Sequence, residues 1–305
     1  MNKLRRIHKG DTLGLIVAST VINDFNNLTN FIKLLNDHGY KVKEGISLRS
    51  KDGYLSGSDA LRANDLMAMF KDDDIAGILC YKGGYGAQRL LPYLDFEEIK
   101  KHPKLLMGFS DVTVLLNTLN KYADMPTVHG EMGVCLSTYD DFTINDFFRV
   151  LDTGPIGTLK NPKDDAVELV PGIAEGKLVG GNLSLVYALM GTKYEIEFED
   201  NILFIEDVDE RPYSIDRMLS SLVLSEKIQK CKGIICGYFT RCKSDVDQQV
   251  EDLLEHYLKP LGIPVLTNFA SGHDKPFVNL PIGLIIRLNT HDKSVTALES
   301  LYLEK

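Results

Sequence analysis

Ser110 is placed where a serine hydroxyl could act as a nucleophile. The apolar run Leu105–Met107 predicts a buried strand, and the spacing of Val112, Leu115 and Leu119 predicts one face of a helix. Ser110 therefore lies on a tight strand-to-helix turn, where its hydroxyl projects beside free N–H groups. Hydrolases often present a catalytic serine in this way. The elbow motif G-x-S-x-G is incomplete because Val112 replaces its second glycine, so a serine that caps a helix also fits.

Two histidines could supply the base that a serine nucleophile needs. His273 follows Gly272 in a loop, and His129 lies in Val128-His129-Gly130. The other histidines lie in polar surroundings typical of the surface: His8, His38, His102, His256 and His291. A lone loop histidine is often structural, so the pattern alone leaves both candidates open.

Glu206 is the carboxylate best placed to orient such a histidine. It ends the apolar run Ile202–Ile205, and the carboxyl end of a buried strand is where α/β proteins bind ligands. The acidic residues that follow it, Asp207, Asp209 and Glu210, also fit solvated loop charge.

A glycine-dense loop, Gly83-Gly84-Tyr85-Gly86, follows another predicted strand. Its backbone amides could face a ligand at close range. Neither G-x-G-x-x-G nor the Walker motif is present. The loop fits a phosphate cradle of another kind, an oxyanion hole completed by the amide of Asp111, or a turn without a ligand.

The elements that position these residues alternate between strand and helix in the first half of the chain. The predicted strands are Leu13–Ala18, Lys41–Ile46, Ile75–Tyr81 and Leu105–Phe109, and the predicted helices are Leu28–Leu35, Leu61–Phe70 and the segment after Ser110. Such alternation predicts a parallel sheet with helices on both faces. The glycine loop and Ser110 both fall at the carboxyl ends of its strands.

The second half is less regular. We interpret residues 1–155 as an N-terminal α/β domain, residues 156–170 as a linker or mobile loop, and residues 171–305 as a C-terminal domain. The strands predicted there are Asn201–Ile205, Gly233–Cys236, Pro264–Leu266, Leu284–Leu288 and Ser294–Leu298, with helices over Ile215–Leu222 and near Val246–Leu258. This order predicts a second α/β domain.

Composition argues against several other classes of function. A net charge of -9 without a basic block argues against a nucleic-acid partner. No run approaches the ~18 apolar residues of a membrane span, so we expect no membrane partner. The five cysteines form no C-x-x-C pair, which favours a reducing compartment and a cytoplasmic location. No ligand cluster with metal-site spacing appears.

Six short segments together resemble the LD-carboxypeptidase family of serine peptidases, which also contains the microcin C immunity peptidases. They are Gly83–Gly86, Gly108–Asp111, Gly180–Ser184, Glu206–Asp207, Pro212–Arg217 and Gly272–His273. They span nearly the whole chain in the order and at the spacing of the family. Six ordered matches are far more specific than any one of them.

The resemblance implies a Ser-His-Glu triad, with Ser110 as nucleophile, His273 as base and Glu206 as the carboxylate that orients the histidine. The oxyanion donors that it implies are the amides of Gly83 or Gly84 and of Asp111. It also implies a flavodoxin-like N-terminal parallel-sheet domain, a smaller C-terminal α/β domain with a barrel-like sheet, and a homodimer. No metal or other cofactor is implied.

By the same resemblance the substrate is a murein tetrapeptide, from which terminal D-alanine is removed in cell-wall recycling. The D-alanine carboxylate needs a cation or amide donors, and the candidates are Lys82, Arg89, Arg211 and Arg217. Tyr85 and Asn182 are further candidate contacts, although Asn182 also fits a helix-start cap. Lys82 replaces a frequent arginine and Glu131 a frequent proline of the family, which leaves the contacts near both positions open.

Three alternatives accompany this hypothesis. An immunity-type peptidase would use the same triad on an aminoacyl-nucleotide toxin and would benefit from an aromatic ring stacked on adenine. The chain has no tryptophan, which favours the murein peptide, although Tyr85 or Tyr213 could stack. A non-catalytic α/β ligand-binding protein would make the triad a coincidence. A nicotinamide oxidoreductase lacks support, because the first strand-to-helix turn, Ala18–Val21, has no glycine fingerprint.

Overall fold

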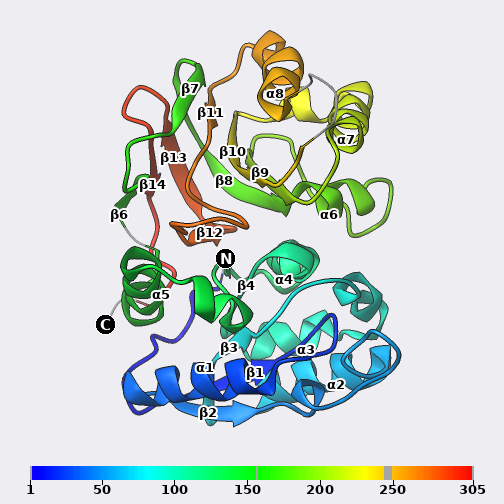
Figure 1. The fold of residues 1–305 in the computed structure, drawn as a ribbon, viewed down its shortest axis with the longest axis vertical. Coiled ribbons are helices and arrows are strands. Elements are labelled where there is room, and N and C mark those ends of the chain that lie inside the picture. Colours follow the sequence, from blue (N-terminus) through cyan, green and yellow to red (C-terminus); the bar gives the residue numbers. More distant parts are fainter. Residues whose placement is uncertain (1, 156, 244–248, 304–305) are drawn as a thin grey trace.

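The computed structural model describes residues 2–155, 157–243 and 249–303. It consists of two stacked halves, each built around one sheet, with the N-terminal half at the bottom of Figure 1. The two ends of the described chain meet at the N-terminal half, where Leu4 pairs with Tyr302.

The N-terminal sheet has the strand order of flavodoxin-like folds. Its parallel strands run in the order β2-β1-β3-β4-β5. They are β1 (Thr12–Ile16), β2 (Lys41–Glu44), β3 (Ile75–Cys80), β4 (Leu105–Gly108) and β5 (Thr127–His129). The order reverses between β1 and β3, the point at which such sheets bind ligands. The glycine loop follows β3, and Ser110 lies just after β4. The strand order confirms the expected flavodoxin-like domain.

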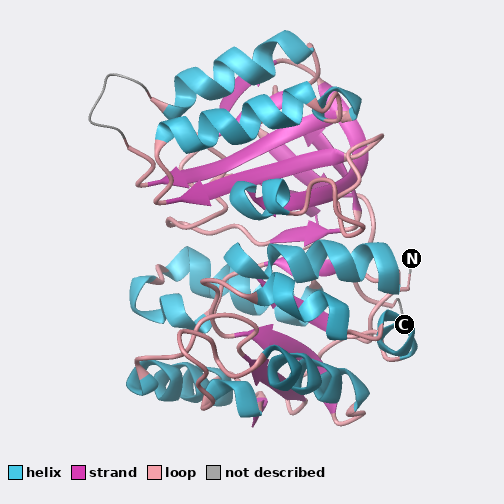
Figure 2. Ribbon diagram, turned by 90° about the vertical axis from the view of Figure 1, so that its right-hand side faces the viewer, coloured by secondary structure: helices cyan, strands magenta, loops and turns pink. Residues whose placement is uncertain are grey.

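Helices flank this sheet (Figure 2). They are α1 (Phe25–Asp37), α2 (Asp59–Lys71), α3 (Phe96–Lys101), α4 (Thr113–Ala123) and α5 (Asp141–Thr153). Side-chain caps set the starts of α1 and α2: Asp24 accepts the Asn27 amide, and Ser58 accepts the Leu61 amide. Short 3-10 helices cover Ile46–Leu48, Ala87–Tyr93, Ser110–Val112 and Gly133–Thr138.

The C-terminal sheet has eight strands in the order β6-β14-β13-β8-β9-β10-β11-β7. They are β6 (Gly157–Leu159), β7 (Val167–Val170), β8 (Ile173–Asn182), β9 (Ile202–Val208), β10 (Gly233–Thr240), β11 (Val265–Thr267), β13 (Ile285–Asn289) and β14 (Ser294–Ala297). Strands β8 to β11 are parallel and the other pairings are antiparallel. The helices are α6 (Leu183–Ala188), α7 (Pro212–Leu224) and α8 (Val250–Leu258), with 3-10 turns at Ile228–Lys230 and Lys259–Leu261.

This sheet curls in the barrel-like manner that the resemblance implied. Glu168 of β7 accepts the Thr290 hydroxyl at 2.7 Å. Because Thr290 directly follows β13, the β7 edge of the sheet is brought to the end of β13. Figures 1 and 2 show α7 and α8 on the side of the sheet that faces away from the N-terminal half.

Several elements differ from the sequence expectation. The segment interpreted as a linker contributes β6 and β7, and α5 and β8 had no predicted counterpart. In β8 the glycines Gly176, Gly180 and Gly181 interrupt the alternation from which a strand is recognised. Of the helix predicted near 246–258, residues 246–248 lie outside the described residues, and α8 covers Val250–Leu258. The domain boundaries themselves stay a prediction.

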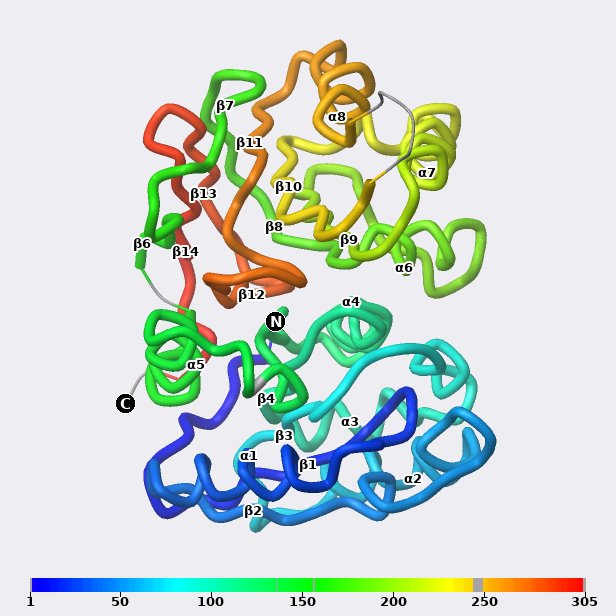
Figure 3. Tube along the Cα trace, in the orientation of Figure 1, coloured from blue at the N-terminus to red at the C-terminus, as the bar shows by residue number. Residues whose placement is uncertain are grey.

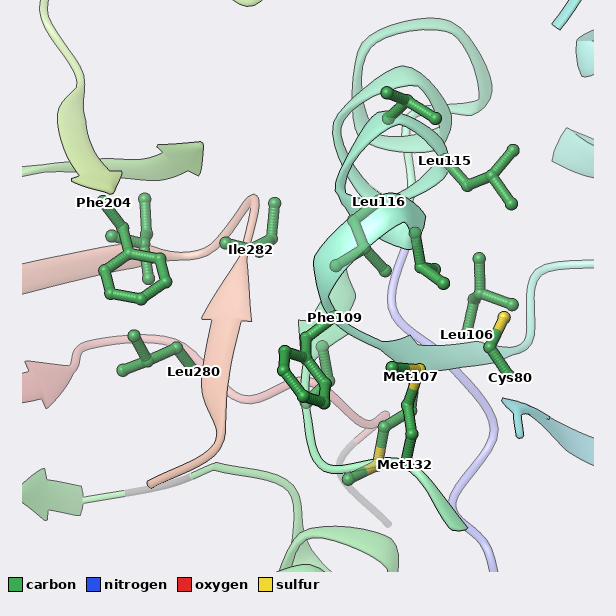
Figure 4. Packing of buried hydrophobic residues seen from close by; sticks show 14 of the residues in the cluster. Cys80, Leu106, Met107, Phe109, Leu115, Leu116, Met132, Phe204, Leu280 and Ile282 are labelled. Carbon is green, nitrogen blue, oxygen red and sulfur yellow. The ribbon is translucent and has the colours of Figure 1, made fainter. Parts of the chain in front are cut away.

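One strand from the C-terminal part of the chain joins the N-terminal sheet. Strand β12 (Leu280–Ile282) pairs antiparallel with β5, and Leu280 lies opposite His129. Figure 3 shows this segment returning to the boundary between the halves before β13 leaves it. Phe109 lies at the same boundary, between the packed side chains of β4 and α4 on one side and Phe204 and Leu280 on the other (Figure 4).

The close approach of β8 to β9 requires glycine at position 180. Gly180 has a φ of 107°, and a Cβ there would lie 2.1 Å from the backbone oxygen of Phe204. We expect Gly180→Ala to lower the free energy of unfolding by at least about 2 kcal/mol, as urea denaturation would measure. Gly191→Ala is the matched control, because Gly191 has a φ of 73° but open space around it, and should cost about 1 kcal/mol. Equal losses in the two variants would contradict the argument.

Candidate active site

Strand β4 ends at Gly108 and is followed by Phe109. Ser110 then begins the 3-10 helix that leads into α4. Its φ is 62°, in the left-handed region that serine seldom adopts and that a nucleophile elbow imposes. The turn faces the glycine loop, because a Cβ built on Gly83 would lie 3.2 Å from the Ser110 Oγ. The structure thus brings Ser110 and the glycine loop together, and a glycine at position 83 leaves space beside the hydroxyl.

Glu206 and His273 form a buried hydrogen-bonded pair. The Nδ1 atom of His273 lies 2.7 Å from Oε2 of Glu206, whose side chain is fully buried. With Glu206 ionised, Nδ1 must donate, which leaves Nε2 free to accept a proton. Gly272 makes the contact possible: its φ is 131°, and a Cβ there would lie 2.9 Å from Oε2.

The charge around His273 favours its protonated form. Burial alone would lower its pKa, but the charge of Glu206 and the hydrogen bond to it outweigh burial and raise the pKa above the ordinary 6.5. The charges of Asp207 and Glu131 act in the same direction.

Phe109 links the Glu206–His273 pair to Ser110. Its ring centroid lies 4.7 Å from that of His273, and the next residue is Ser110. Within the described residues no hydrogen bond joins Ser110 to His273, so the proton transfer between them stays a prediction. Contacts of this kind often form only when substrate is bound.

His129, the rival base, is enclosed by aromatic rings. Its ring is stacked at 9° on Phe277 and lies edge-on to Phe204 and Phe109. It has no exposed surface, and within the described part of the chain neither ring nitrogen has a hydrogen-bond partner. Burial lowers its pKa to about 4. The geometry therefore favours His273, the partly exposed histidine, as the residue that meets a substrate.

The glycine loop is held to the turn after Ser110 by the Asp111 carboxylate. This buried group accepts the Ser19 hydroxyl at 2.6 Å and the Ala87 amide at 2.7 Å, and burial raises its pKa. Across the described ranges no hydrogen bond takes up the backbone amides of Gly83, Gly84 and Asp111. Free amides of this kind can stabilise a developing oxyanion.

The candidate substrate contacts have different surroundings. Half-buried Lys82 donates to the Val21 carbonyl at 2.9 Å, and burial lowers its pKa. Tyr85 is exposed beside Tyr54, with ring centroids 5.9 Å apart. Arg211 is exposed at the start of α7.

The other candidates are engaged with protein groups. Arg89 forms a salt bridge with Asp59, and Arg217 lies over the Tyr213 ring. Asn182 is buried, accepts the Leu185 amide as the cap of α6, and donates to Asp207. The capping alternative for Asn182 is therefore observed, and its contact with substrate stays a prediction.

Two polar groups at the site were not found from the sequence. Arg62 is fully buried and donates to the carbonyls of Gly57 and Gly86, the latter in the glycine loop. Nothing in its helical segment distinguishes it from a surface arginine. Lys275 forms a buried ion pair with Glu131, and the only signal was the departure from the family pattern at Glu131.

Two further features of the described residues concern metal ligands and membrane spans. No group of three His, Cys, Asp or Glu side chains is arranged there to hold a metal ion. None of the helices in those ranges is both long and apolar enough to cross a membrane.

Residues 13–130 match the model of the LD-carboxypeptidase N-terminal domain, and residues 175–288 match that of the LD-carboxypeptidase C-terminal domain. A probable murein peptide carboxypeptidase of Bacillus subtilis is 38% identical over 302 residues, covering 96% of this chain and 93% of the relative. The chain belongs to the LD-carboxypeptidase family. It is therefore a serine carboxypeptidase, as the six segments had indicated.

Two further relatives of this LD-carboxypeptidase bear names for different substrates. The crystal structure of muramoyltetrapeptide carboxypeptidase from Oxalobacter formigenes superposes with a TM-score of 0.79 at 28% identity, covering 93% of this chain and 97% of that one. The microcin C7 self-immunity protein MccF of Escherichia coli is 27% identical and covers 95% of this chain and 94% of its own.

The surroundings of the two histidines predict the pH dependence of this carboxypeptidase. A general base must be neutral, so activity should fall as the pH decreases through the raised pKa of His273, above pH 6.5. His129→Phe should keep kcat/KM within about threefold, because the apolar site accepts a phenyl ring of similar shape. It should also leave in place this fall in activity at low pH, the acid limb of the pH profile. A limb near pH 4 that disappears in His129→Phe would instead make His129 the titrating base.

Proposed function

We propose that this enzyme removes the terminal D-alanine from murein tetrapeptides during cell-wall recycling, using Ser110, His273 and Glu206. The observation that carries the proposal is the buried 2.7 Å contact between Glu206 and His273, beside the strained turn of Ser110. The names of the Bacillus subtilis and Oxalobacter formigenes relatives support the substrate class.

In the first step the Ser110 Oγ attacks the carbonyl carbon of the scissile bond while Nε2 of His273 takes the hydroxyl proton. The imidazolium that forms is stabilised by Glu206 through Nδ1, because a carboxylate buried at this distance interacts strongly with the new charge. Its hydrogen bond also fixes the tautomer in which Nε2 accepts.

The tetrahedral intermediate places a negative charge on the former carbonyl oxygen. The amides of Gly83 or Gly84 and of Asp111 are the proposed donors to it, and their lack of partners in the described chain supports this role. Loss of one such donor typically lowers turnover ~10²–10³-fold. The Asp111 carboxylate contributes by holding the glycine loop and the serine turn in one arrangement.

Collapse of the intermediate transfers the proton from His273 to the departing amine of D-alanine and leaves an ester on Ser110. Water then attacks the ester, with His273 again taking the proton, and the tetrapeptide is released shortened by one residue. Every proton in this cycle passes through the single Nε2 atom of His273.

Lys82 is the cation that we propose for the D-alanine carboxylate. It directly precedes the glycine loop, and its ammonium donates to a backbone carbonyl. In contrast to Arg89, it forms no salt bridge within the described residues. Because burial lowers the pKa of Lys82, an arriving carboxylate would strengthen its charged form. Tyr85 and Arg211, both exposed, are the proposed contacts for the longer acyl part of the substrate.

An aminoacyl-nucleotide toxin is the second candidate substrate. The relationship to MccF favours it, and the chemistry at Ser110 would be unchanged. An adenine ring would require an exposed aromatic plane, which Tyr85 or Tyr213 would supply in a chain without tryptophan. The higher identity to the murein peptide carboxypeptidase favours the first substrate.

Location and assembly extend the proposal. The five cysteines are all free in the structure, which supports a reducing compartment such as the cytoplasm. The resemblance to the family supports a homodimer, for which light scattering coupled to size-exclusion chromatography is the direct test.

The proposed nucleophile is tested by mass spectrometry of a purified tetrapeptide incubated with enzyme. Wild type should release D-alanine, and Ser110→Ala should fold normally and release it about 10⁴-fold more slowly or not at all. Ser221→Ala is the matched control and should behave as wild type, because among the described residues its hydroxyl bonds only to the Arg217 carbonyl on α7. Near-normal turnover by folded Ser110→Ala would refute the mechanism. Hydrolysis of an aminoacyl-nucleotide, without D-alanine release from lysine-type or diaminopimelate-type stems, would favour the second substrate.

The role of Lys82 predicts a change in KM more than in kcat. We expect Lys82→Met to raise KM for the tetrapeptide about tenfold or more, because the lost contact exists before and during the reaction. With a tetrapeptide amidated at its C-terminus, wild type and Lys82→Met should have similar KM values. Arg211→Met is the comparison for the competing cation. An unchanged KM in Lys82→Met together with a raised KM in Arg211→Met would transfer the role to Arg211.

A further inference from the structure

The loop that carries His273 is bound to the N-terminal half by buried polar contacts. The Phe277 amide donates to the Thr143 hydroxyl at 3.0 Å. Asn279 donates through its backbone and side-chain nitrogens to the Asp146 carboxylate of α5, at 3.0 and 2.6 Å. Although it follows the C-terminal sheet in sequence, the segment after His273 is therefore part of the half that carries Ser110.

Along the sequence, the polar contact with the N-terminal half that comes first after His273 is the ion pair between Lys275 and Glu131. The Glu131 side chain is fully buried and that of Lys275 is 15% exposed. The Lys275 ammonium also lies over the rings of Phe277 and Tyr139, at 5.4 and 6.0 Å from their centroids. Aromatic faces and a buried carboxylate together enclose this cation.

Glu131 is in turn fixed to the strand of the proposed nucleophile. Its amide donates to the Asn279 side chain at 2.9 Å, and its Oε1 atom accepts the Met132 amide at 2.9 Å. The preceding residue, Gly130, donates to the carbonyl of Gly108 at 3.0 Å, at the end of β4. A short series of bonded residues therefore joins Lys275 to the turn of Ser110.

A buried ion pair is a poor source of net stability, because desolvation offsets its Coulomb attraction. What it provides is a defined geometry, because two charges withdrawn from water are satisfied in only one arrangement. His273 lies between two such buried carboxylates: Glu206 contacts its ring from the C-terminal sheet, and Glu131 contacts Lys275 from the N-terminal one.

We propose that the Lys275–Glu131 ion pair is a positioning device, which holds His273 at the reacting distance from Ser110. The proposal rests on the function proposed above, in which His273 is the general base. Neither residue touches the reacting atoms. Glu131 also explains a departure from the family pattern, because a proline at that position could not pair with Lys275.

The test compares Glu131→Gln, Lys275→Met and the double variant with wild type. Each single variant should fold, keep KM within about threefold and lose kcat about 10–100-fold, the cost of a base displaced by about 1 Å. The double variant should lose no more than the worse single variant, because the two residues act as one unit. Lys275→Arg keeps the cation and should recover most of kcat.

The acid limb of kcat/KM gives a second readout that a purely structural role would not move. The charged groups that act on His273 are Glu206, Asp207 and Glu131, with Asp209 and His129 further contributors. Removal of the Glu131 charge should move the limb to lower pH. Lys275→Met leaves that negative charge in place and should not move the limb downward.

The matched control is the ion pair Lys227–Glu195, which lies within the C-terminal half. Lys227→Met and Glu195→Gln should leave kcat and the pH profile unchanged.

Wild-type kcat in folded Glu131→Gln and Lys275→Met would overturn the proposal, as would a loss in Lys275→Arg equal to that in Lys275→Met. If a single variant does not fold, the Lys275→Arg and double variants decide. His273→Ala separates the two hypotheses: if it stays active, the proposed function is wrong, whereas an inactive His273→Ala with unimpaired ion-pair variants refutes only the positioning device.

Discussion

The hydrogen bond between Glu206 and His273 joins a buried strand of the C-terminal sheet to a distant loop, and the surrounding backbone is shaped to allow it. A fully buried carboxylate must have partners, and a histidine from a distant loop supplies one at 2.7 Å. The chain makes room for this side chain with two glycines. A Cβ on Gly272 would lie 2.9 Å from the Glu206 Oε2, and one on Gly237 would lie 2.2 Å from the Ser271 carbonyl oxygen and 3.1 Å from the Glu206 Cβ. Backbone on two different segments is thus shaped around one acidic side chain, which accounts for the local sequence Gly272-His273.

At β12 the chain returns to the N-terminal sheet, and this return places the Glu206–His273 bond at the half that carries Ser110. Glu206 belongs to the C-terminal sheet, yet the segment after His273 is hydrogen-bonded to α5 and pairs with β5. The histidine therefore bridges two bodies instead of extending from one of them. Rotation of the halves relative to each other would strain the Glu206–His273 bond while the contacts with α5 remained. In such an arrangement the position of the proposed base relative to the Ser110 turn is set within the N-terminal half, and its pKa is raised chiefly by Glu206 of the C-terminal half.

Sequence patterns predicted the elements whose apolar residues recur along one helical face or form one continuous run. Strands β1 and β3 and helices α1 and α2 were expected close to where they lie, because their buried positions follow one face or one continuous run. Strand β8 was missed because its glycines serve close packing against Phe204 and Thr113, and glycine carries no hydropathy signal. The partners of Lys275 and Arg62 were missed for a different reason. The Lys275–Glu131 and Arg62–Gly86 contacts join segments more than twenty residues apart, and pairing at that range leaves no local pattern.

The same distinction explains why the chemistry of this family is easier to predict than its substrate. The groups that would carry out the reaction are fixed by motifs with local causes: a positive φ at Ser110, glycines where a side chain would collide, and a carboxylate at the end of a buried strand. Tyr85 and Arg211 obey no such constraint, because an exposed side chain can change without disturbing a neighbour. This division fits the names of two relatives, a muramoyltetrapeptide carboxypeptidase and a microcin C7 self-immunity protein. Substrate identity therefore depends on the few rim residues that packing leaves free, and inheritance of the fold does not determine it.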